Sequence, residues 1–261
     1  MRILVTNDDG IDAPGLHAVA QALRADGHEL TIVAPDVEYS GSGSSLGTLE
    51  DGAEIRYEKR LFEALRDVPT ISVQAPPAFA VFCACAGLFG PAPDLVVSGI
   101  NPGHNTGRMI MYSSTVASAL SAAGFGVRGL AVSCGFPPDH RFDTAATVAV
   151  DAVRWMIEAS EPRTVLNINV PDMDLSELKG VRMAPLASRG LLGLSFETGP
   201  ESIRLLRHAN TDRLGTGTDS ALVRDGYVAV SALGTVRALE PNAGVAAYLE
   251  AGLSLTSRIE I

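Results

Sequence analysis

Two carboxylates stand side by side near the start of the chain, in the stretch Asn7-Asp8-Asp9-Gly10. This stretch directly follows the apolar run Ile3-Leu4-Val5. Adjacent like charges are costly unless solvent keeps them apart or a cation neutralises them. The dipeptide by itself therefore allows two interpretations, a solvated turn or a cation site.

Two further loops have the same placement and are also rich in side-chain oxygen atoms. Residues 36–47 follow the apolar run 30–33, and residues 98–107 follow the apolar run 95–97. Because ligands of open parallel sheets bind outside the carboxyl ends of the strands, we expect the three loops to meet at one edge. Taken alone, the second loop would also fit a linker and the third a simple turn. The oxygen-bearing residues are Asn7, Asp8, Asp9, Ser40, Ser42, Ser44, Ser45, Ser98, Asn101 and Asn105.

This mixture of oxygen donors favours a particular kind of cation. Carboxylate, hydroxyl and amide oxygens are the ligands that Mg²⁺, Mn²⁺ and Ca²⁺ prefer. The same loops contain no set of histidines and cysteines, so Zn²⁺ is less favoured. The joint placement of the loops makes the cation site a stronger hypothesis than any one loop does.

A fourth segment could bind the opposite charge. Residues Tyr112–Val116 open an Ala-rich stretch with helical character, and the free N–H groups of a helix start attract anions. Ser113 or Ser114 could instead serve only as a helix cap, a role that is compatible with anion binding. A cation next to an anion site indicates hydrolysis of a phosphoryl group. His104, in the third loop, is a further candidate for contact with the substrate.

The elements that must position these loops alternate along the first two thirds of the chain. A helix from Pro14 to Gly27 follows the first loop, with Asp12 expected as its cap, and the next strand covers 30–33. The regular alternation ends near residue 172. We expect a catalytic core over 1–172 and a β-rich lobe over 173–261 that does not fold independently. The remaining elements are predicted as strands 71–73, 95–97, 130–133, 165–170, 180–185 and 226–233 and helices 77–88, 113–123, 143–159 and 243–251.

Composition excludes several classes of protein. The 261 residues carry a formal net charge of -10, which argues against binding to a nucleic-acid polymer. Three cysteines provide no disulfide framework and fit a reducing compartment. The chain begins without a secretory signal, and its apolar runs are too short to span a membrane. We therefore expect a cytoplasmic protein that acts on a small phosphorylated substrate.

Six segments of the chain match one known family in order. They are ILVTNDDGIDAPG, VAPDVEYSGSGSSL, DLVVSGINPGHNTG, YSSTVASA, LNINVP and GTDSALVRDGYVAVSAL. The chain resembles the SurE family of survival-protein nucleotidases, and the resemblance covers essentially its whole length. It implies a three-layer α/β/α fold with a Rossmann-like, mostly parallel sheet. It also implies a C-terminal β-hairpin that joins subunits in a homodimer or homotetramer.

The resemblance also implies an activity and a cofactor. Members of the family are divalent-metal-dependent phosphatases that act on nucleoside monophosphates. One Mg²⁺ or Mn²⁺ per subunit is implied, with Ca²⁺ as a possible substitute in crystals. The family's metal ligands correspond to Asp8, Asp9, Ser40 and Asn101. Asp8 and Asp9 are then the catalytic pair, with Asp9 orienting the attacking water unless a covalent aspartyl intermediate forms.

Substrate contacts are implied around the helix start and the third loop. The residues concerned are Asn7, Ser113, Ser114, Thr115, Asn105 and His104. The sequence departs from the family pattern at Ser114, where a glycine is usual, at Ser121, where a glutamate is usual, and in the segment 75–81. These departures keep open a specialised phosphatase of a biosynthetic pathway, or a metal-binding homologue with little turnover. A group-transferring enzyme remains open too, whereas a receiver domain would need a suitably placed lysine that this chain lacks.

Overall fold

The computed structural model describes residues 1–135, 140–210, 212, 214–236 and 248. Its strands are β1 (Arg2–Thr6), β2 (Glu29–Pro35), β3 (Tyr57–Arg60), β4 (Thr70–Val73), β5 (Leu95–Pro102), β6 (Arg128–Cys134), β7 (Val165–Asn169), β8 (Val181–Met183), β9 (Leu192–Thr198), β10 (Ile203–Ala209) and β11 (Val228–Leu233). Its helices are α1 (Pro14–Ala25), α2 (Pro77–Cys85), α3 (Ser114–Gly124), α4 (Phe142–Ala159) and α5 (Asp219–Arg224), with short 3-10 turns η1 (Glu63–Leu65), η2 (Gly107–Tyr112) and η3 (Leu175–Glu177).

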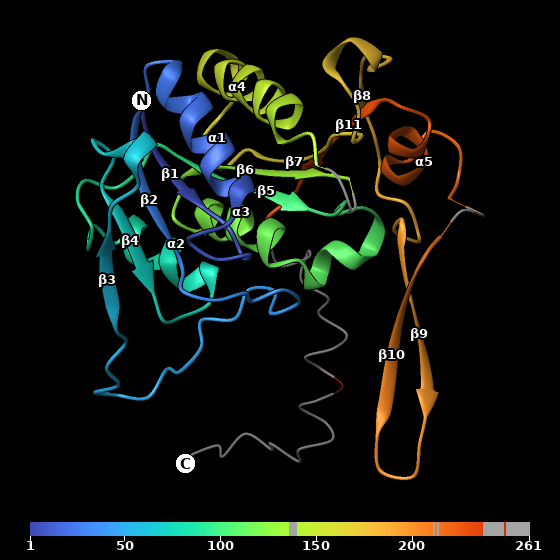
Figure 1. Ribbon diagram of the computed structural model, residues 1–261, viewed down its shortest axis with the longest axis horizontal. Helices are drawn as coiled ribbons and strands as arrows, with labels where there is room; N and C mark the ends of the chain where they lie inside the picture. Colours follow the sequence, from blue (N-terminus) through green and yellow to red (C-terminus); the bar gives the residue numbers. More distant parts are fainter. Residues whose placement is uncertain (136–139, 211, 213, 237–247, 249–261) are drawn as a thin grey trace, which may run out of the picture.

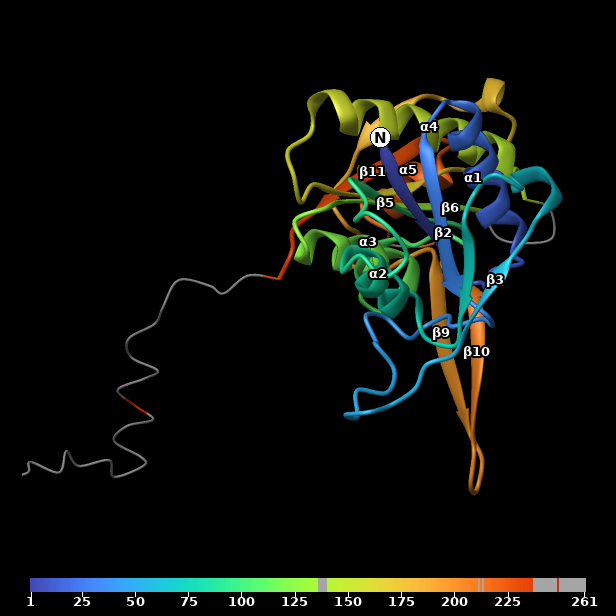
Figure 2. The ribbon, with the colours of Figure 1, turned by 90° about the vertical axis from the view of Figure 1, so that its left-hand side faces the viewer.

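The described residues build one nine-stranded sheet in the order β3-β4-β2-β1-β5-β6-β7-β11-β8. The strands from β4 through β7 run parallel, whereas β3 and β11 are antiparallel to their neighbours β4 and β7. Helices α1 and α4 cover one face of the sheet, and α2 and α3 cover the other (Figures 1 and 2). The mostly parallel three-layer α/β/α fold predicted from the sequence is confirmed.

The short apolar run at the start of β1 is buried on both of its faces. Ile3 and Val5 pack into the core beneath α1 and α4, while Leu4 packs into the core beneath α2. All three side chains are at most 1 % exposed. Parallel strands covered by helices on both sides lose the alternation of apolar and polar residues, which explains why this run is uninterrupted.

Helix α1 begins where the sequence placed it, but its cap differs from the prediction. The N-cap residue is Ala13, and its side chain makes no capping hydrogen bond. The expected cap, Asp12, instead accepts a hydrogen bond from the guanidinium of Arg60 (2.8 Å). Pro14 opens the helix without needing a partner for a backbone N–H, so the helix start tolerates the missing cap.

The later third of the chain completes the main sheet. Strand β11 pairs with β7 on one side and with β8 on the other, so elements on both sides of residue 172 share one sheet. The strands predicted near 180–185 and 226–233 are confirmed as β8 and β11. The helix predicted over 243–251 lies outside the described residues, apart from the single residue Tyr248.

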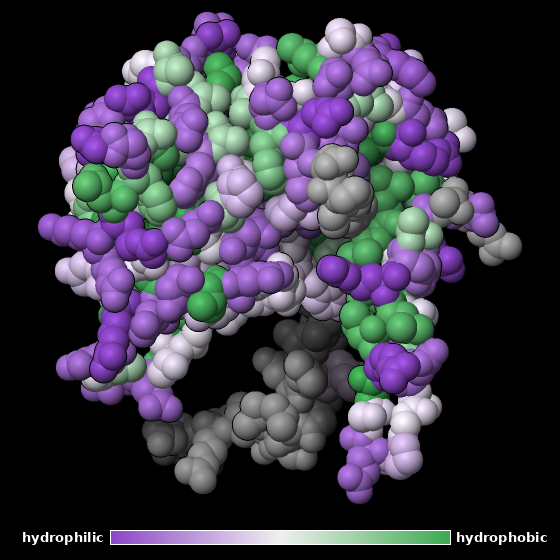
Figure 3. All heavy atoms as spheres, viewed as in Figure 1, coloured by the Kyte–Doolittle hydropathy of each residue, from purple (hydrophilic) through white to green (hydrophobic). Residues whose placement is uncertain are grey.

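Strands β9 and β10 form an antiparallel arm that projects away from the sheet (Figure 1). Phe196, Ile203 and Leu205 on this arm are each more than half exposed. Figure 3 shows hydrophobic residues gathered along the arm above a more polar tip. The sequence pattern did not locate these strands, which entered the prediction only through the family resemblance.

Cys83, Cys85 and Cys134 are all free thiols. Within the described ranges, no helix combines the length and apolar character needed to cross a bilayer.

Helix α1 approaches the third polar loop unusually closely at Gly15. A Cβ atom at this position would lie 2.0 Å from the carbonyl oxygen of Ile100. Only glycine permits this approach, because a contact that short with backbone forces a shift of the chain. Ile100 directly precedes Asn101, so the contact between α1 and β5 helps to fix where the third loop begins.

We expect Gly15→Ala to lower the free energy of unfolding by about 3 kcal/mol, because α1 or β5 must move to relieve the clash. Gly124→Ala is the matched control, since a Cβ at this other helical glycine would meet no atom within 4 Å. The control should leave stability unchanged or raise it slightly. Urea unfolding followed by circular dichroism measures both values, and equal stability of the two variants would contradict the prediction.

Candidate active site

The carboxyl ends of β1, β2 and β5 meet at one edge of the sheet. Strand β1 lies between β2 and β5, so the loops that follow these three strands are neighbours. The first two loops are joined directly, because the backbone N–H of Tyr39 donates to the carbonyl oxygen of Asp8 (2.8 Å). Helix α3 begins at the same edge. The structure therefore brings the two acidic residues, the Ser/Gly loop and the helix start together.

Asp8 is held by a short hydrogen bond from α3. The hydroxyl of Thr115 donates to Asp8 Oδ1 at 2.6 Å, and both side chains are almost completely buried. Burial raises the pKa of Asp8, although the hydrogen bond from Thr115 opposes this effect. The predicted phosphate contact Thr115 thus has a side chain that orients a carboxylate.

Burial perturbs the pKa of the second carboxylate, Asp9, in the same direction. Burial raises its pKa to about 7, and the neighbouring carboxylates of Asp8 and Glu38 act in the same direction. Two like charges close together in a poorly solvated position favour retention of a proton unless a cation is present. The resulting site has a strong demand for positive charge.

Two acceptor atoms at this edge support a cation site directly. Asp9 Oδ2 and Asn7 Oδ1 are buried without a hydrogen-bond partner, while Asn7 Nδ2 donates to the carbonyl oxygen of Gly10 (3.0 Å). Buried acceptors are nearly always satisfied, because an unmade hydrogen bond costs about 1–3 kcal/mol. The orphaned oxygens therefore fit a cation as their missing partner.

Other ligands would have to be neutral oxygens. In the described part of the chain, no group of three or more His, Cys, Asp and Glu side chains could hold a metal. Ser40 is exposed at a turn of the second loop. Asn101 lies where the pairing of β5 with β6 shifts register, and its Nδ2 donates to the carbonyl oxygen of Gly103 (2.6 Å). That hydrogen bond leaves the amide oxygen of Asn101 as the atom suited to a cation.

The two serines at the start of α3 have separate tasks. Ser113 is the N-cap, and its Oγ accepts a hydrogen bond from the backbone N–H of Val116 (3.2 Å). Ser114 is fully buried, and its hydroxyl donates to the carbonyl oxygen of Tyr39 (2.9 Å). The backbone N–H groups of the first turn precede the helix's own hydrogen-bond ladder and are the groups suited to an anion.

His104 and Asn105 are tied into the protein itself. Nε2 of His104 lies 2.9 Å from the carbonyl oxygen of Val170. Burial lowers the pKa of His104 to about 4, so its ring is neutral at physiological pH. The predicted contact of this histidine with substrate would therefore be uncharged.

The side-chain amide of Asn105 donates to Ser133 Oγ (2.9 Å). Its backbone carbonyl oxygen accepts hydrogen bonds from the side-chain amides of Asn167 and Asn169 on β7. These bonds fix the third loop against β6 and β7.

Sequence reasoning missed one buried carboxylate that supports the third loop. Asp219 is fully buried, and its two oxygens accept hydrogen bonds from the backbone N–H groups of Gly107, Ala187 and Ser220 at 2.7–2.8 Å. It therefore joins the end of the third loop to the later third of the chain. The only local signal is a Thr-Asp pair at the start of α5, which is also an ordinary helix start.

A family model described as "Survival protein SurE" matches residues 3–191. The chain belongs to the SurE family.

Two curated relatives are similar over most of their length. The "5'-nucleotidase SurE" of Stenotrophomonas maltophilia (strain K279a) is 39% identical over 239 residues, 88% of each chain. That of Xanthomonas oryzae pv. oryzae (strain PXO99A) is 36% identical over 267 residues, 97% of this chain and 98% of the relative. The crystal structure of the SurE protein from Aquifex aeolicus has a TM-score of 0.78 at 29% identity and covers 96% of this chain and 100% of its own. The resemblance seen in the sequence is confirmed.

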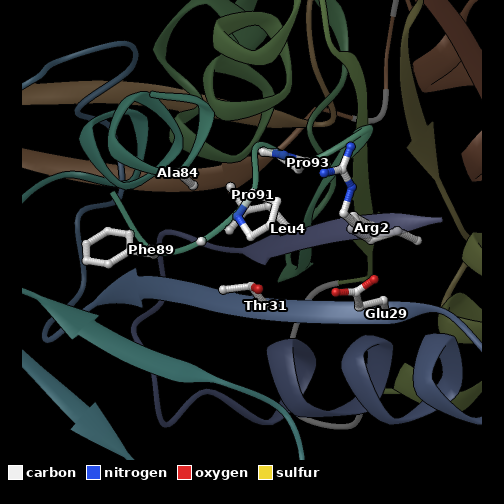
Figure 4. Close-up of a pocket in the computed structure, with 10 residues that line it drawn as sticks. Arg2, Leu4, Glu29, Thr31, Ala84, Phe89, Pro91 and Pro93 are labelled. Atoms are coloured by element: carbon white, nitrogen blue, oxygen red, sulfur yellow. The ribbon is translucent and has the colours of Figure 1, made fainter. Parts of the chain in front are cut away.

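The amino ends of the strands offer a poor alternative site in this SurE-family chain. Arg2, Glu29, Thr31 and Phe89 line a pocket there (Figure 4). Its volume is about 30 Å³, and Arg2 and Glu29 begin β1 and β2, at the ends of these strands away from Asp8 and Asp9. This is room for about one water molecule and not for a nucleotide.

The raised pKa of Asp9 predicts how metal-free stability depends on pH. The folded state holds this proton up to a pH of about 7, against an ordinary value of 3.8, so folding becomes less favourable as pH rises from about 4 to 7. We expect Asp9→Asn to raise the free energy of unfolding in EDTA by roughly 2 kcal/mol at pH 8, and by less at pH 5. Thermal unfolding at both pH values tests this, and an equal gain at both would contradict it.

Asp219→Asn should be far more damaging than its chemistry suggests, because an amide nitrogen would face backbone N–H donors. We expect a loss of about 3 kcal/mol in the free energy of unfolding. Asp225→Asn, at an exposed position beside Arg224, is the matched control and should leave the free energy of unfolding close to that of the unchanged protein. Urea unfolding of the two variants decides the point, and similar losses would refute the supporting role of Asp219.

Proposed function

We propose that this SurE-family chain is a divalent-metal-dependent phosphomonoesterase that hydrolyses nucleoside monophosphates. The observation that carries the proposal is the meeting of the buried carboxylate of Asp8, the half-buried carboxylate of Asp9, orphaned acceptor oxygens and the first turn of α3 at one edge of the sheet. Both curated relatives described above are named 5'-nucleotidase, which supports the same class of reaction.

Asp8, Asp9, Ser40 and Asn101 would hold one Mg²⁺ or Mn²⁺ per subunit. When bound, such a cation polarises the phosphate and lowers the pKa of an attacking water. The first-turn N–H groups of Ser114 and Thr115 would bind the phosphate oxygens, and Asn7 would add the N–H of Nδ2 that does not donate to Gly10. The hydrogen bond from Thr115 holds the Asp8 carboxylate in one orientation throughout.

The carboxylate of Asp9 would orient the attacking water. The water oxygen forms a bond to phosphorus, and the ester P–O bond breaks. Asp9 accepts the proton of the water, and the leaving alkoxide takes a proton from solvent. The products are inorganic phosphate and a nucleoside.

One observation favours a second candidate, a specialised phosphatase with a less polar substrate. A groove of about 380 Å³ runs between α2 and the edge strand β3. Phe79, at the start of α2, lines it together with Ile55, Tyr57 and Val73. An apolar groove lined by Val73, the last residue of β4, would suit a phosphomonoester whose leaving group is aromatic or aliphatic.

We expect release of inorganic phosphate from adenosine 5'-monophosphate in the presence of Mn²⁺ or Mg²⁺ and none in EDTA. Asp9→Asn should lower kcat by at least about 10³-fold, because it removes both a cation ligand and the proton acceptor. Asp225→Asn, on the surface, is the matched control and should keep the activity of the unchanged protein.

A panel that adds p-nitrophenyl phosphate and aliphatic phosphomonoesters separates the two candidates. Preference for these over every nucleotide would favour the specialised phosphatase. Background turnover with every substrate would favour a metal-binding homologue, and transfer of the phosphoryl group without free phosphate would favour a transferase.

We further infer a homodimer or homotetramer joined through the arm β9–β10, whose exposed Phe196, Ile203 and Leu205 suit a subunit contact. Residues 173–261 would not fold alone, because β11 takes β7 as its pairing partner. Free thiols throughout the chain fit the cytoplasm. Light scattering of the purified protein gives the oligomeric state.

A further inference from the structure

The second loop contains a tight turn with Ser40 at its corner. The backbone N–H of Ser42 donates to the carbonyl oxygen of Tyr39 (3.2 Å), and Gly41 has a φ of 81°. A positive φ at the third residue of such a turn is the conformation that glycine adopts without strain. Ser40 is exposed, so packing of its own side chain does not hold it in place.

The two ends of this turn are fastened from two different elements. On the side of β1, the backbone N–H of Tyr39 donates to the carbonyl oxygen of Asp8 (2.8 Å). On the side of α3, the hydroxyl of Ser114 donates to the carbonyl oxygen of Tyr39 (2.9 Å) and lies 2.9 Å from Ser42 Oγ. Ser114 therefore contacts both residues that bracket the Ser40-Gly41 corner.

We propose that Ser114 is a positioning residue that presets Ser40 as a ligand of the divalent cation. The inference rests on the proposed cation site, in which Ser40 is one of the ligands. The hydroxyl of Ser114 does not itself reach the cation in this proposal. It acts through the turn, in the way that hydrogen bonds behind a ligand commonly raise metal affinity.

The composition of the loop explains why such a fastening matters. Gly41, Gly43 and Gly47 all have positive φ values, and the loop is otherwise rich in serine. Glycine loses more conformational freedom on ordering than any other residue, so a free loop of this kind would be costly to order around a cation. The hydrogen bonds of the buried Ser114 hydroxyl order part of the loop during folding, so that less conformational entropy is lost when a cation binds.

The test compares Ser114→Ala and Ser42→Ala with Ser118→Ala. Ser118 is a buried serine on the same helix, and its hydroxyl donates to the carbonyl oxygen of Ser114 instead of to the loop (2.8 Å). Two readouts apply. Hydrogen–deuterium exchange of the peptide covering 36–47 is followed in EDTA, and the Kd for Mn²⁺ is measured by titration calorimetry.

We expect faster exchange of the loop in Ser114→Ala and a Kd for Mn²⁺ raised about 10-fold. Ser118→Ala should match the unchanged protein in both measurements. The effects of Ser42→Ala and Ser114→Ala should be less than additive in the double variant, because both remove one shared contact.

A Kd of Ser114→Ala within twofold of the unchanged protein would overturn the proposal, whatever the exchange shows. Failure of the cation site itself gives a different result. In that case the unchanged protein binds no Mn²⁺, or Asp9→Asn binds it equally well. If the cation site is sound and Ser114→Ala exchanges faster in 36–47 with an unchanged Kd for Mn²⁺, Ser114 holds the turn but has no role toward the cation, and the proposal is refuted.

Discussion

Two adjacent carboxylates, Asp8 and Asp9, follow the buried end of β1, and the cost of their neighbouring negative charges is the constraint on which the rest of the site depends. Asp8 and Asp9 follow each other in the chain, so the fold cannot place them in different parts of the molecule. Burial makes their charge more expensive than it would be in water. Thr115 partners one oxygen of Asp8, whereas Asp9 Oδ2 and Asn7 Oδ1 are left without a donor. The site is thus built around an unmet demand for positive charge.

Meeting that demand with neutral oxygens requires loops held at fixed positions. The third loop is fixed by the close approach of Gly15 to Ile100 and by the hydrogen bonds of Asn105. Asp219 ties its far end to the part of the chain that carries β8 and β11. The later third of this SurE-family chain therefore supports the site without supplying any of its proposed cation ligands. A substitution in the later third of the chain, far from Asp9 in the sequence, can for this reason disturb the position of the third loop.

The elements that could be predicted from the sequence are those with local signals. Apolar runs predict β1, β2 and β5, and helical spacing predicts α1. The βαβ pattern that results predicts that Asp8, Ser40 and Asn101 lie at one edge of the sheet. Long-range hydrogen bonds have no such signal. Nothing near Asp12 indicates that Arg60, 48 residues later, will bind it in place of the helix start. The same holds for Ser114 and Tyr39, which are 75 residues apart, and for Asp219 and Gly107, which are 112 apart.

The distribution of basic residues extends the electrostatic argument from the cation to the substrate. The four segments that form the edge, 6–12, 36–47, 98–107 and 112–116, contain no lysine or arginine. His104, the one histidine among them, is neutral at physiological pH because burial holds its pKa near 4. A helix start contributes only about half a positive charge. A phosphomonoester dianion would therefore be repelled by ionised Asp8 and Asp9, and a divalent cation would both neutralise the pair and attract the phosphate to these segments. Binding of substrate to this edge should accordingly depend on the cation as strongly as the chemical step does.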